Sequence, residues 1–155
     1  MRTRYFAALL TAGLCLCQQG PDPWPSTAVL DPATLAGILK AGDGKQQPHV
    51  ICVAFPVLYR AKHIAHSSFA GPGSKAEGIE DLKKAVAGLD KNADIVLYCG
   101  CCPMDRCPNI RPAFRVLAEL GYTKVKILNV PTNMHDDWTS KGYPTESASE
   151  DPPKK

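Results

Sequence analysis

The stretch from Ile95 to Pro112 reads Ile-Val-Leu-Tyr-Cys-Gly-Cys-Cys-Pro-Met-Asp-Arg-Cys-Pro-Asn-Ile-Arg-Pro. A short apolar run ends at Cys99, and three more cysteines follow before a helical pattern begins near Pro112. This order places the cysteine loop (residues 99–107) between a buried strand and the N-terminal end of a helix. Helix N-termini carry unpaired N–H groups and the positive end of the helix dipole, so they favour a negative charge. A thiolate held there has a lowered pKa, and the stretch therefore predicts a reactive, sulfur-handling loop.

The size and charge of the chain limit its class. Its 155 residues suit one domain that buries its own core without disulfide bonds. The formal net charge is +3, and two of the positive charges, Arg2 and Arg4, lie at the extreme N-terminus. Because no other run of basic residues occurs, we expect no nucleic acid among the partners.

The N-terminus has the pattern of an export signal. Two arginines precede an apolar run from Tyr5 to Leu16, which is too short to span a membrane. We therefore expect residues 1–17 to be a signal peptide and the protein to be exported, as a periplasmic or secreted protein. Cys15 and Cys17 are candidates for lipid attachment, although each follows a leucine where a small residue is expected. Contact with a membrane is expected only if one of these two cysteines is lipidated.

Two polar segments bound the expected domain. Residues 18–30 contain three prolines and predict an extended linker. Residues 147–155 are polar and charged and predict a disordered tail. We therefore expect residues 31–146 to form a single domain.

The hydrophobic pattern of the domain alternates between helix and strand. We expect helices at 32–40, 79–89, 113–120 and 135–141, with one helical turn at 58–63. We expect strands at 49–55, 95–98 and 125–130, with a short strand at 67–70. This alternation predicts an α/β fold, a mostly parallel sheet flanked by helices on both faces. Ligands bind such sheets beyond the carboxyl ends of the strands, which is where the cysteine loop lies.

Several motifs occur in the order found in one known family, and on them residues 31–146 resemble a rhodanese-like domain. The strand end with Cys99 matches the position of the family's nucleophilic cysteine, and the next helix and strand follow in the expected order. The motifs that carry the resemblance are His63-Ile64, Tyr98-Cys99-Gly100, Leu120-Gly121-Tyr122, Val125 to Leu128, and the spacing of Trp138, Gly142 and Pro144.

The sequence also departs from the family pattern. The loop after Cys99 is longer than usual, and Lys62 stands where a glycine precedes the histidine. The Asp-Val-Arg that usually ends the early strand is replaced around Val53-Ala54-Phe55, and the usual Gly-Gly is replaced near Val130-Pro131. These departures predict a divergent subgroup with its own Cys-Gly-Cys-Cys-Pro motif.

The resemblance implies sulfur transfer without a cofactor. A thiolate takes the sulfane sulfur of a small anionic donor such as thiosulfate, becomes a persulfide, and passes the sulfur to a thiol or cyanide. Cys99 is the leading nucleophile, because the end of the strand fixes its position. Cys101 competes with it, since Cys101 and Arg106 have the Cys-x4-Arg spacing of many rhodaneses. Gly100, Arg106 and Arg111 are the candidates for binding the donor, although Arg111 could simply extend from the helix start.

Other roles of the cysteines stay open. Cys102 and Cys107 could resolve a persulfide by forming a disulfide, or the loop could be a disulfide-bonded or thiol-redox site in an exported protein. The four cysteines could hold zinc or copper, but their Cys-x-Cys-Cys-x4-Cys spacing lacks the two knuckles usual for zinc, so we expect no metal. A binding-only module is a further alternative. A Cys-x5-Arg phosphatase loop is excluded, because no cysteine has an arginine at that spacing.

Overall fold

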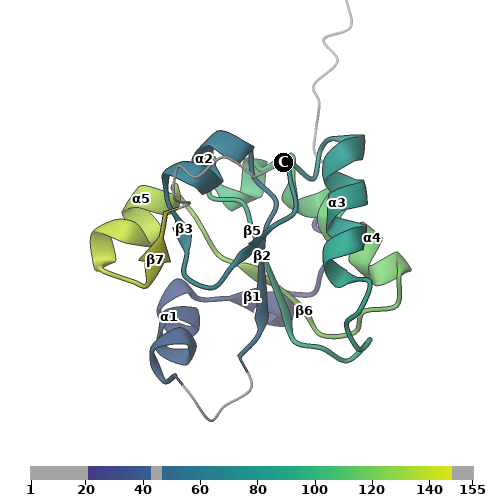
Figure 1. Ribbon diagram of the computed structural model, residues 1–155, viewed down its shortest axis with the longest axis horizontal. Helices are drawn as coiled ribbons and strands as arrows, with labels where there is room; N and C mark the ends of the chain where they lie inside the picture. The colour runs from purple at the N-terminus through teal and green to yellow at the C-terminus, as the bar shows by residue number, and fades with distance from the viewer. Residues whose placement is uncertain (1–20, 43–46, 148–155) are drawn as a thin grey trace, which may run out of the picture.

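A central parallel sheet organises the protein. The computed structural model describes residues 21–42 and 47–147, so the expected signal peptide, Cys15 and Cys17 lie outside the described residues. Five strands form the sheet in the order β1-β6-β5-β2-β4, and every neighbouring pair is parallel (Figure 1). They are β1 (Val29–Leu30), β2 (His49–Cys52), β4 (Ser68–Phe69), β5 (Ile95–Tyr98) and β6 (Val125–Leu128).

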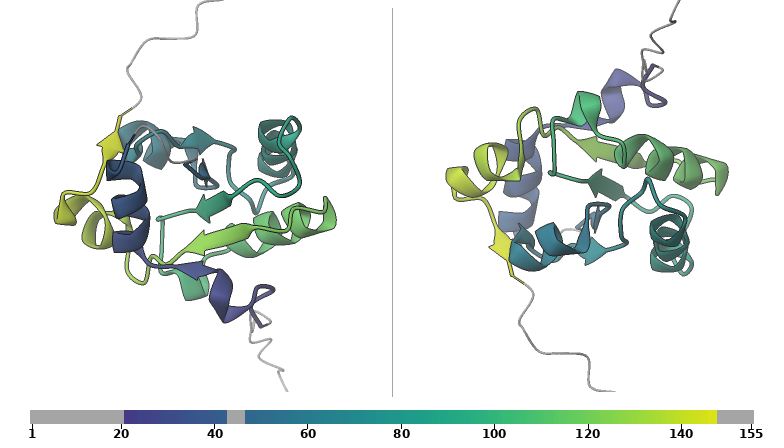
Figure 2. Two further views of the ribbon diagram at one scale, coloured as in Figure 1. Left: turned by 90° about the horizontal axis from the view of Figure 1, so that it is seen from below. Right: turned by 90° about the horizontal axis from the view of Figure 1, so that it is seen from above.

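Helices cover both faces of this sheet, as the sequence predicted. Helices α1 (Pro32–Lys40) and α5 (Met134–Asp137) lie on one face, and α3 (Ala76–Val86) and α4 (Ile110–Glu119) lie on the other (Figure 2). The shorter elements are α2 (Pro56–Ala61), the antiparallel pair β3 (His63–Ile64) and β7 (Thr145–Glu146), and the 3-10 turns η1 (Ser26–Ala28), η2 (Met104–Arg106) and η3 (Thr139–Lys141). No helix in the described part of the chain has the length and apolar character needed to cross a membrane.

The core lies where the apolar runs of the sequence meet. All four residues of β5 are buried, as expected for a central strand covered on both faces. Trp138 is fully buried between α5 and η3, and its indole Nε1 donates to the Pro144 carbonyl at 2.9 Å. Gly142 follows with φ +66°, the left-handed conformation that lets a glycine end this turn.

The segment expected to be a linker is in part folded. Trp24 is buried in the core and makes an edge-to-face contact with Phe114 of α4, with ring centroids 5.5 Å apart. Strand β1 pairs with β6 at one edge of the sheet, with Val29 opposite Ile127. The prediction for residues 18–30 was therefore wrong from Trp24 onward, because the aromatic ring and the edge strand gain contacts that the local, proline-rich pattern does not reveal.

Several element boundaries also differ from the prediction. Strand β2 ends at Cys52, and the chain then turns into α2. Helix α4 begins at Ile110, ahead of Pro112, because proline is well accommodated in the first turn of a helix. Ile38 of α1 and Leu120 after α4 are among the exposed large hydrophobic residues.

Candidate functional site

Cys99 is the first residue after the central strand β5. Its side chain is only 6% exposed. Gly100 follows with φ +71°, and a Cβ at this position would lie 2.9 Å from the Cβ of Met134. The Gly100 carbonyl accepts a hydrogen bond from the Met134 N–H at 3.1 Å. Glycine is therefore required here, because the start of α5 packs directly on the turn that presents Cys99.

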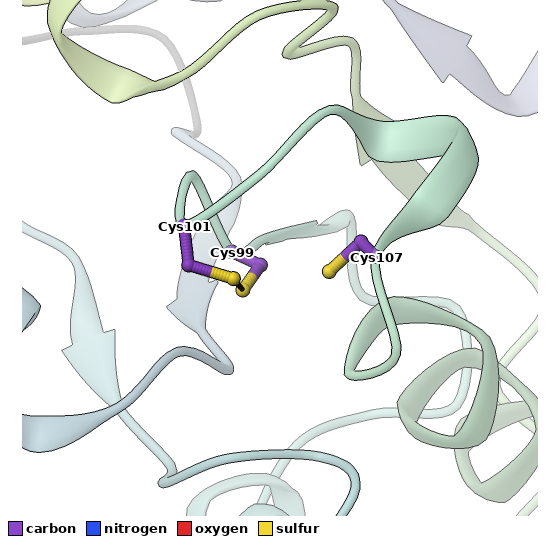
Figure 3. A group of neighbouring side chains, drawn as sticks. All are labelled: Cys99, Cys101 and Cys107. Atoms are coloured by element: carbon purple, nitrogen blue, oxygen red, sulfur yellow. Dashed lines mark hydrogen bonds between the residues drawn. The ribbon is translucent and has the colours of Figure 1, made fainter.

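The cysteine loop folds back so that three thiols meet. The Sγ atoms of Cys99, Cys101 and Cys107, which we call the thiol cluster, all lie within 4.8 Å of one another (Figure 3). The Cys99 and Cys101 sulfurs are 3.0 Å apart, and the Cys102 sulfur lies 3.3 Å from that of Cys101. The sequence predicted the thiols on one loop, and the structure brings these four side chains together.

Turn η2 brings Cys107 back to the strand end. The Met104 N–H donates to the Val130 carbonyl at 2.9 Å, which fastens the loop to the segment after β6. The Cys107 N–H then donates to the Met104 carbonyl at 3.2 Å. Cys107 is 1% exposed and points at the other two sulfurs from just before α4 (Figure 3).

Asn109 is a site residue that the sequence reasoning missed. Its side chain is fully buried, and Nδ2 donates to the Cys99 sulfur at 3.3 Å while Oδ1 accepts from the Ser74 N–H at 3.0 Å. A Cβ on Gly73 would lie 2.2 Å from the Asn109 carbonyl oxygen, so the segment before α3 packs tightly here. A polar residue directly before a helix was the available signal, but the helix was expected to begin later.

The thiol cluster concentrates negative charge on Cys107. Hydrogen bonds from Cys101 and Cys99, followed by backbone N–H groups of Asn109 and Ile110 at the start of α4, lower the pKa of Cys107 to about 2. The helix terminus thus acts on a thiolate as predicted, but on Cys107, because α4 begins at Ile110. The other thiols stay protonated beside this charge.

The pKa values of the remaining cysteines rise for related reasons. A hydrogen bond from Cys101 lowers the pKa of Cys99, but the hydrogen bond to Cys107 and burial outweigh it and raise the value to about 12. Hydrogen bonds to Cys107 and Cys99 raise the pKa of Cys101, and burial raises that of Cys102. Burial also raises the pKa of Cys52, outside the loop, to about 11.

The two arginines expected to bind the donor lie in different surroundings. Arg111, 11% exposed, is 2.5 Å from an Asp22 carboxylate oxygen and donates to the Cys107 and Asp105 carbonyls at 3.3 and 2.9 Å. These contacts favour a structural role for Arg111 over binding of the donor, because Arg111 joins the N-terminal segment to the cysteine loop. Arg106 lies on η2 with a mostly exposed side chain, 3.9 Å from an Asp105 carboxylate oxygen.

A pocket of about 360 Å³ opens beside Cys99. Cys99 and Gly100 form part of its wall, and neither Arg106 nor Arg111 is among its lining residues. Lys62, which replaces the expected glycine, supplies a cation there that the sequence reasoning did not assign to the site. The wall is completed by Cys52, Leu58, Tyr59, Ala61, Tyr98, Met134, His135 and Thr139.

Solved structures similar to this chain include rhodanese-like domains. The rhodanese-like domain of the Alr3790 protein from Anabaena sp. is 22% identical, with a TM-score of 0.56 over 83% of this chain and 86% of that chain. A crystal structure of the Alr3790 protein is 24% identical, with a TM-score of 0.57 over 76% and 91% of the two chains. The BH2092 protein from Bacillus halodurans is 24% identical, with a TM-score of 0.58 over 77% and 76%.

These similarities, with the parallel sheet and the cysteine at its carboxyl edge, define the class of domain. No protein-family model and no curated protein sequence matches the chain. The chain has a rhodanese-like fold, the fold expected from the motifs around Cys99 and Trp138. Similarity at 22–24% identity identifies the fold rather than the reaction.

Proposed function

We propose that the protein is a rhodanese-type sulfurtransferase in which Cys99 carries sulfane sulfur as a persulfide. The observation that supports this most is the position of Cys99, which lies at the carboxyl end of the central strand and forms part of the wall of the pocket. Ligands of parallel sheets bind at this edge. Cys101 and Cys102 lie on the same loop, but Cys99 is the only loop cysteine that borders this pocket.

The proposed reaction has two steps. The Cys99 sulfur attacks the outer sulfur of thiosulfate, the S–S bond of the donor breaks, and sulfite leaves with the bonding electron pair. The Cys99 proton passes to solvent in the pocket, because Cys107, with its pKa lowered to about 2, is too weak a base to hold it. A cyanide or thiol acceptor then attacks the outer sulfur of the persulfide, which releases thiocyanate or a new persulfide and restores the Cys99 thiolate.

The donor is a small anion, and the pocket offers it a cation. Lys62 lines the pocket with Cys99 and is the cation that we assign to the donor. Arg106, on η2 and outside the lining of this pocket, is the second candidate. Asn109 donates to the Cys99 sulfur and is suited to orient the persulfide. We further propose that the protein works after export, because residues 1–17 have the order of a signal peptide.

Intact-mass measurement of the reduced full chain tests the proposal. After brief exposure to thiosulfate, we expect a gain of about 32 Da, one sulfur atom, that later addition of cyanide removes. Samples treated with sulfate, or alkylated with iodoacetamide before thiosulfate, are the controls and should show no such gain. Absence of the 32 Da species in the thiosulfate sample would contradict the sulfurtransferase function.

The short distance between two thiols favours a second candidate function, thiol–disulfide exchange. The Cys99 and Cys101 sulfurs are 3.0 Å apart, so a disulfide substrate could oxidise them to a disulfide while its own two sulfurs are reduced. The same mass measurement separates the two functions. A loss of about 2 Da on exposure to oxidised glutathione, with no gain from thiosulfate, would favour exchange over sulfur transfer.

A further inference from the structure

We infer that the thiol cluster binds one thiophilic metal ion, Cu(I), through the sulfurs of Cys99, Cys101 and Cys107. The inference goes beyond sulfur transfer, because an ion held by these atoms occupies the sulfur that would carry the persulfide. Metal binding and sulfur transfer would therefore exclude each other. The inference does not depend on the proposed function, since it rests on the arrangement of three sulfurs.

The spacing of the sulfurs suits one shared ion. A metal-to-thiolate bond is about 2.3 Å long, so sulfurs at the corners of a trigonal site lie roughly 4 Å apart. The three Sγ atoms already lie within 4.8 Å of one another, and they converge from the residue after strand β5, from the loop and from the residue after η2. Binding of the ion requires the Cys99 and Cys101 sulfurs, now 3.0 Å apart, to move apart by about 1 Å.

The type and number of ligands select the ion. Soft thiolate ligands favour Cu(I), zinc and iron–sulfur clusters over hard cations. Structural zinc sites are almost always four-coordinate. Within residues 21–42 and 47–147, the group of ligand atoms that lie within 4.8 Å of one another contains only the three thiols, and the Cys102 sulfur, 3.3 Å from that of Cys101, lies outside this group. Cu(I) is satisfied by three thiolates, so the cluster matches Cu(I) better than zinc.

The surroundings of the cluster resemble those of a built metal site. Cys99 and Cys107 are buried, while Cys101 is partly exposed and leaves a route for an ion to enter. Asn109 Nδ2 lies 3.3 Å from the Cys99 sulfur and 3.9 Å from the Cys101 sulfur, so one buried amide orients two of the three ligands. Met104, within the loop, and Met134, at the start of α5, are partly buried and pack against the hydrophobic core.

Anaerobic titration of the reduced full chain with Cu(I) tests the inference. We expect one Cu(I) per chain, held against the chelator bathocuproine and marked by the near-ultraviolet absorption of thiolate-bound Cu(I). Cys107→Ser and Cys101→Ser should each weaken binding at least tenfold. Two cysteine variants serve because Cys107 is buried and Cys101 is partly exposed, so a folding defect in the first leaves the second informative; circular dichroism reports the folding of each.

Matched controls use cysteines outside the cluster. Cys102→Ser removes the neighbouring thiol, and a Cys15→Ser/Cys17→Ser double variant removes the two thiols outside the described residues; both should bind Cu(I) as the unmodified chain does. Uptake of no stoichiometric Cu(I), or equal loss of binding in Cys102→Ser and Cys107→Ser, would overturn the three-sulfur site. The readout needs neither a sulfur donor nor an acceptor, so its outcome is separate from that of the mass measurement.

Discussion

Replacing Cys99 with serine is expected to lower kcat/KM for thiocyanate formation from thiosulfate and cyanide by at least about a thousandfold. A serine hydroxyl is a poor nucleophile toward sulfur and forms no persulfide. Cys99 borders the pocket and accepts a hydrogen bond from the side-chain amide of Asn109. Among the loop cysteines, Cys99 alone combines these two contacts. Steady-state assay of thiocyanate with the reduced full chain measures the effect.

Cys52→Ala is the matched control for this assay. Cys52 lies on the neighbouring strand β2, outside the cysteine loop, and lines the same pocket as Cys99, so its replacement tests whether any cysteine at this pocket supports turnover. We expect this variant to retain turnover within about threefold. Retention of turnover in Cys99→Ser, with loss in Cys101→Ser, would instead identify Cys101 as the nucleophile, in keeping with its Cys-x4-Arg spacing.

Replacing Trp138 with alanine is expected to lower the free energy of unfolding by about 3–5 kcal/mol. The side chain is 0% exposed, and its ring packs edge-on against Tyr143 with centroids 5.1 Å apart. Alanine leaves a cavity of nearly the whole indole and removes the donor to the Pro144 carbonyl. Urea denaturation followed by circular dichroism measures the change.

Trp138→Phe separates the two contributions of this residue. Phenylalanine fills most of the cavity but leaves the Pro144 carbonyl without its 2.9 Å donor, so we expect a smaller loss of about 1–3 kcal/mol. A loss below about 1 kcal/mol for Trp138→Ala would mean that the segment after α5 contributes little to the core.

Local patterns in the sequence were sufficient to predict the layers of the fold. The apolar run Ile95–Tyr98 became the central strand and the helical pattern at 32–40 became α1, both with the predicted boundaries. These features depend on neighbouring residues, which is why periodicity and turn chemistry find them. Strand β1 and Trp24 escaped prediction, because their stability comes from contacts with β6 and Phe114, far along the chain.

The candidate site was predictable as a loop but not as an arrangement of atoms. The four cysteines and the nearby helix terminus were evident from the sequence, whereas the identity of the charged sulfur was not. Cys107 takes the charge because η2 turns the chain back toward the strand end and α4 starts at Ile110. The spacing of the cysteines in the sequence reveals neither feature. Lys62, the residue after α2, lines the pocket because of the path that the folded chain takes, which its local sequence does not reveal.

The most direct test of the account is to locate the sulfane sulfur on the thiosulfate-treated protein. After alkylation with iodoacetamide, trypsin cleaves after Lys91 and Arg106 and so separates Cys107 from the other loop cysteines. Fragmentation of the peptide 92–106 then distinguishes Cys99 from Cys101 and Cys102. The account predicts an alkylated persulfide at Cys99. Sulfur on Cys107 or on no loop cysteine would contradict it.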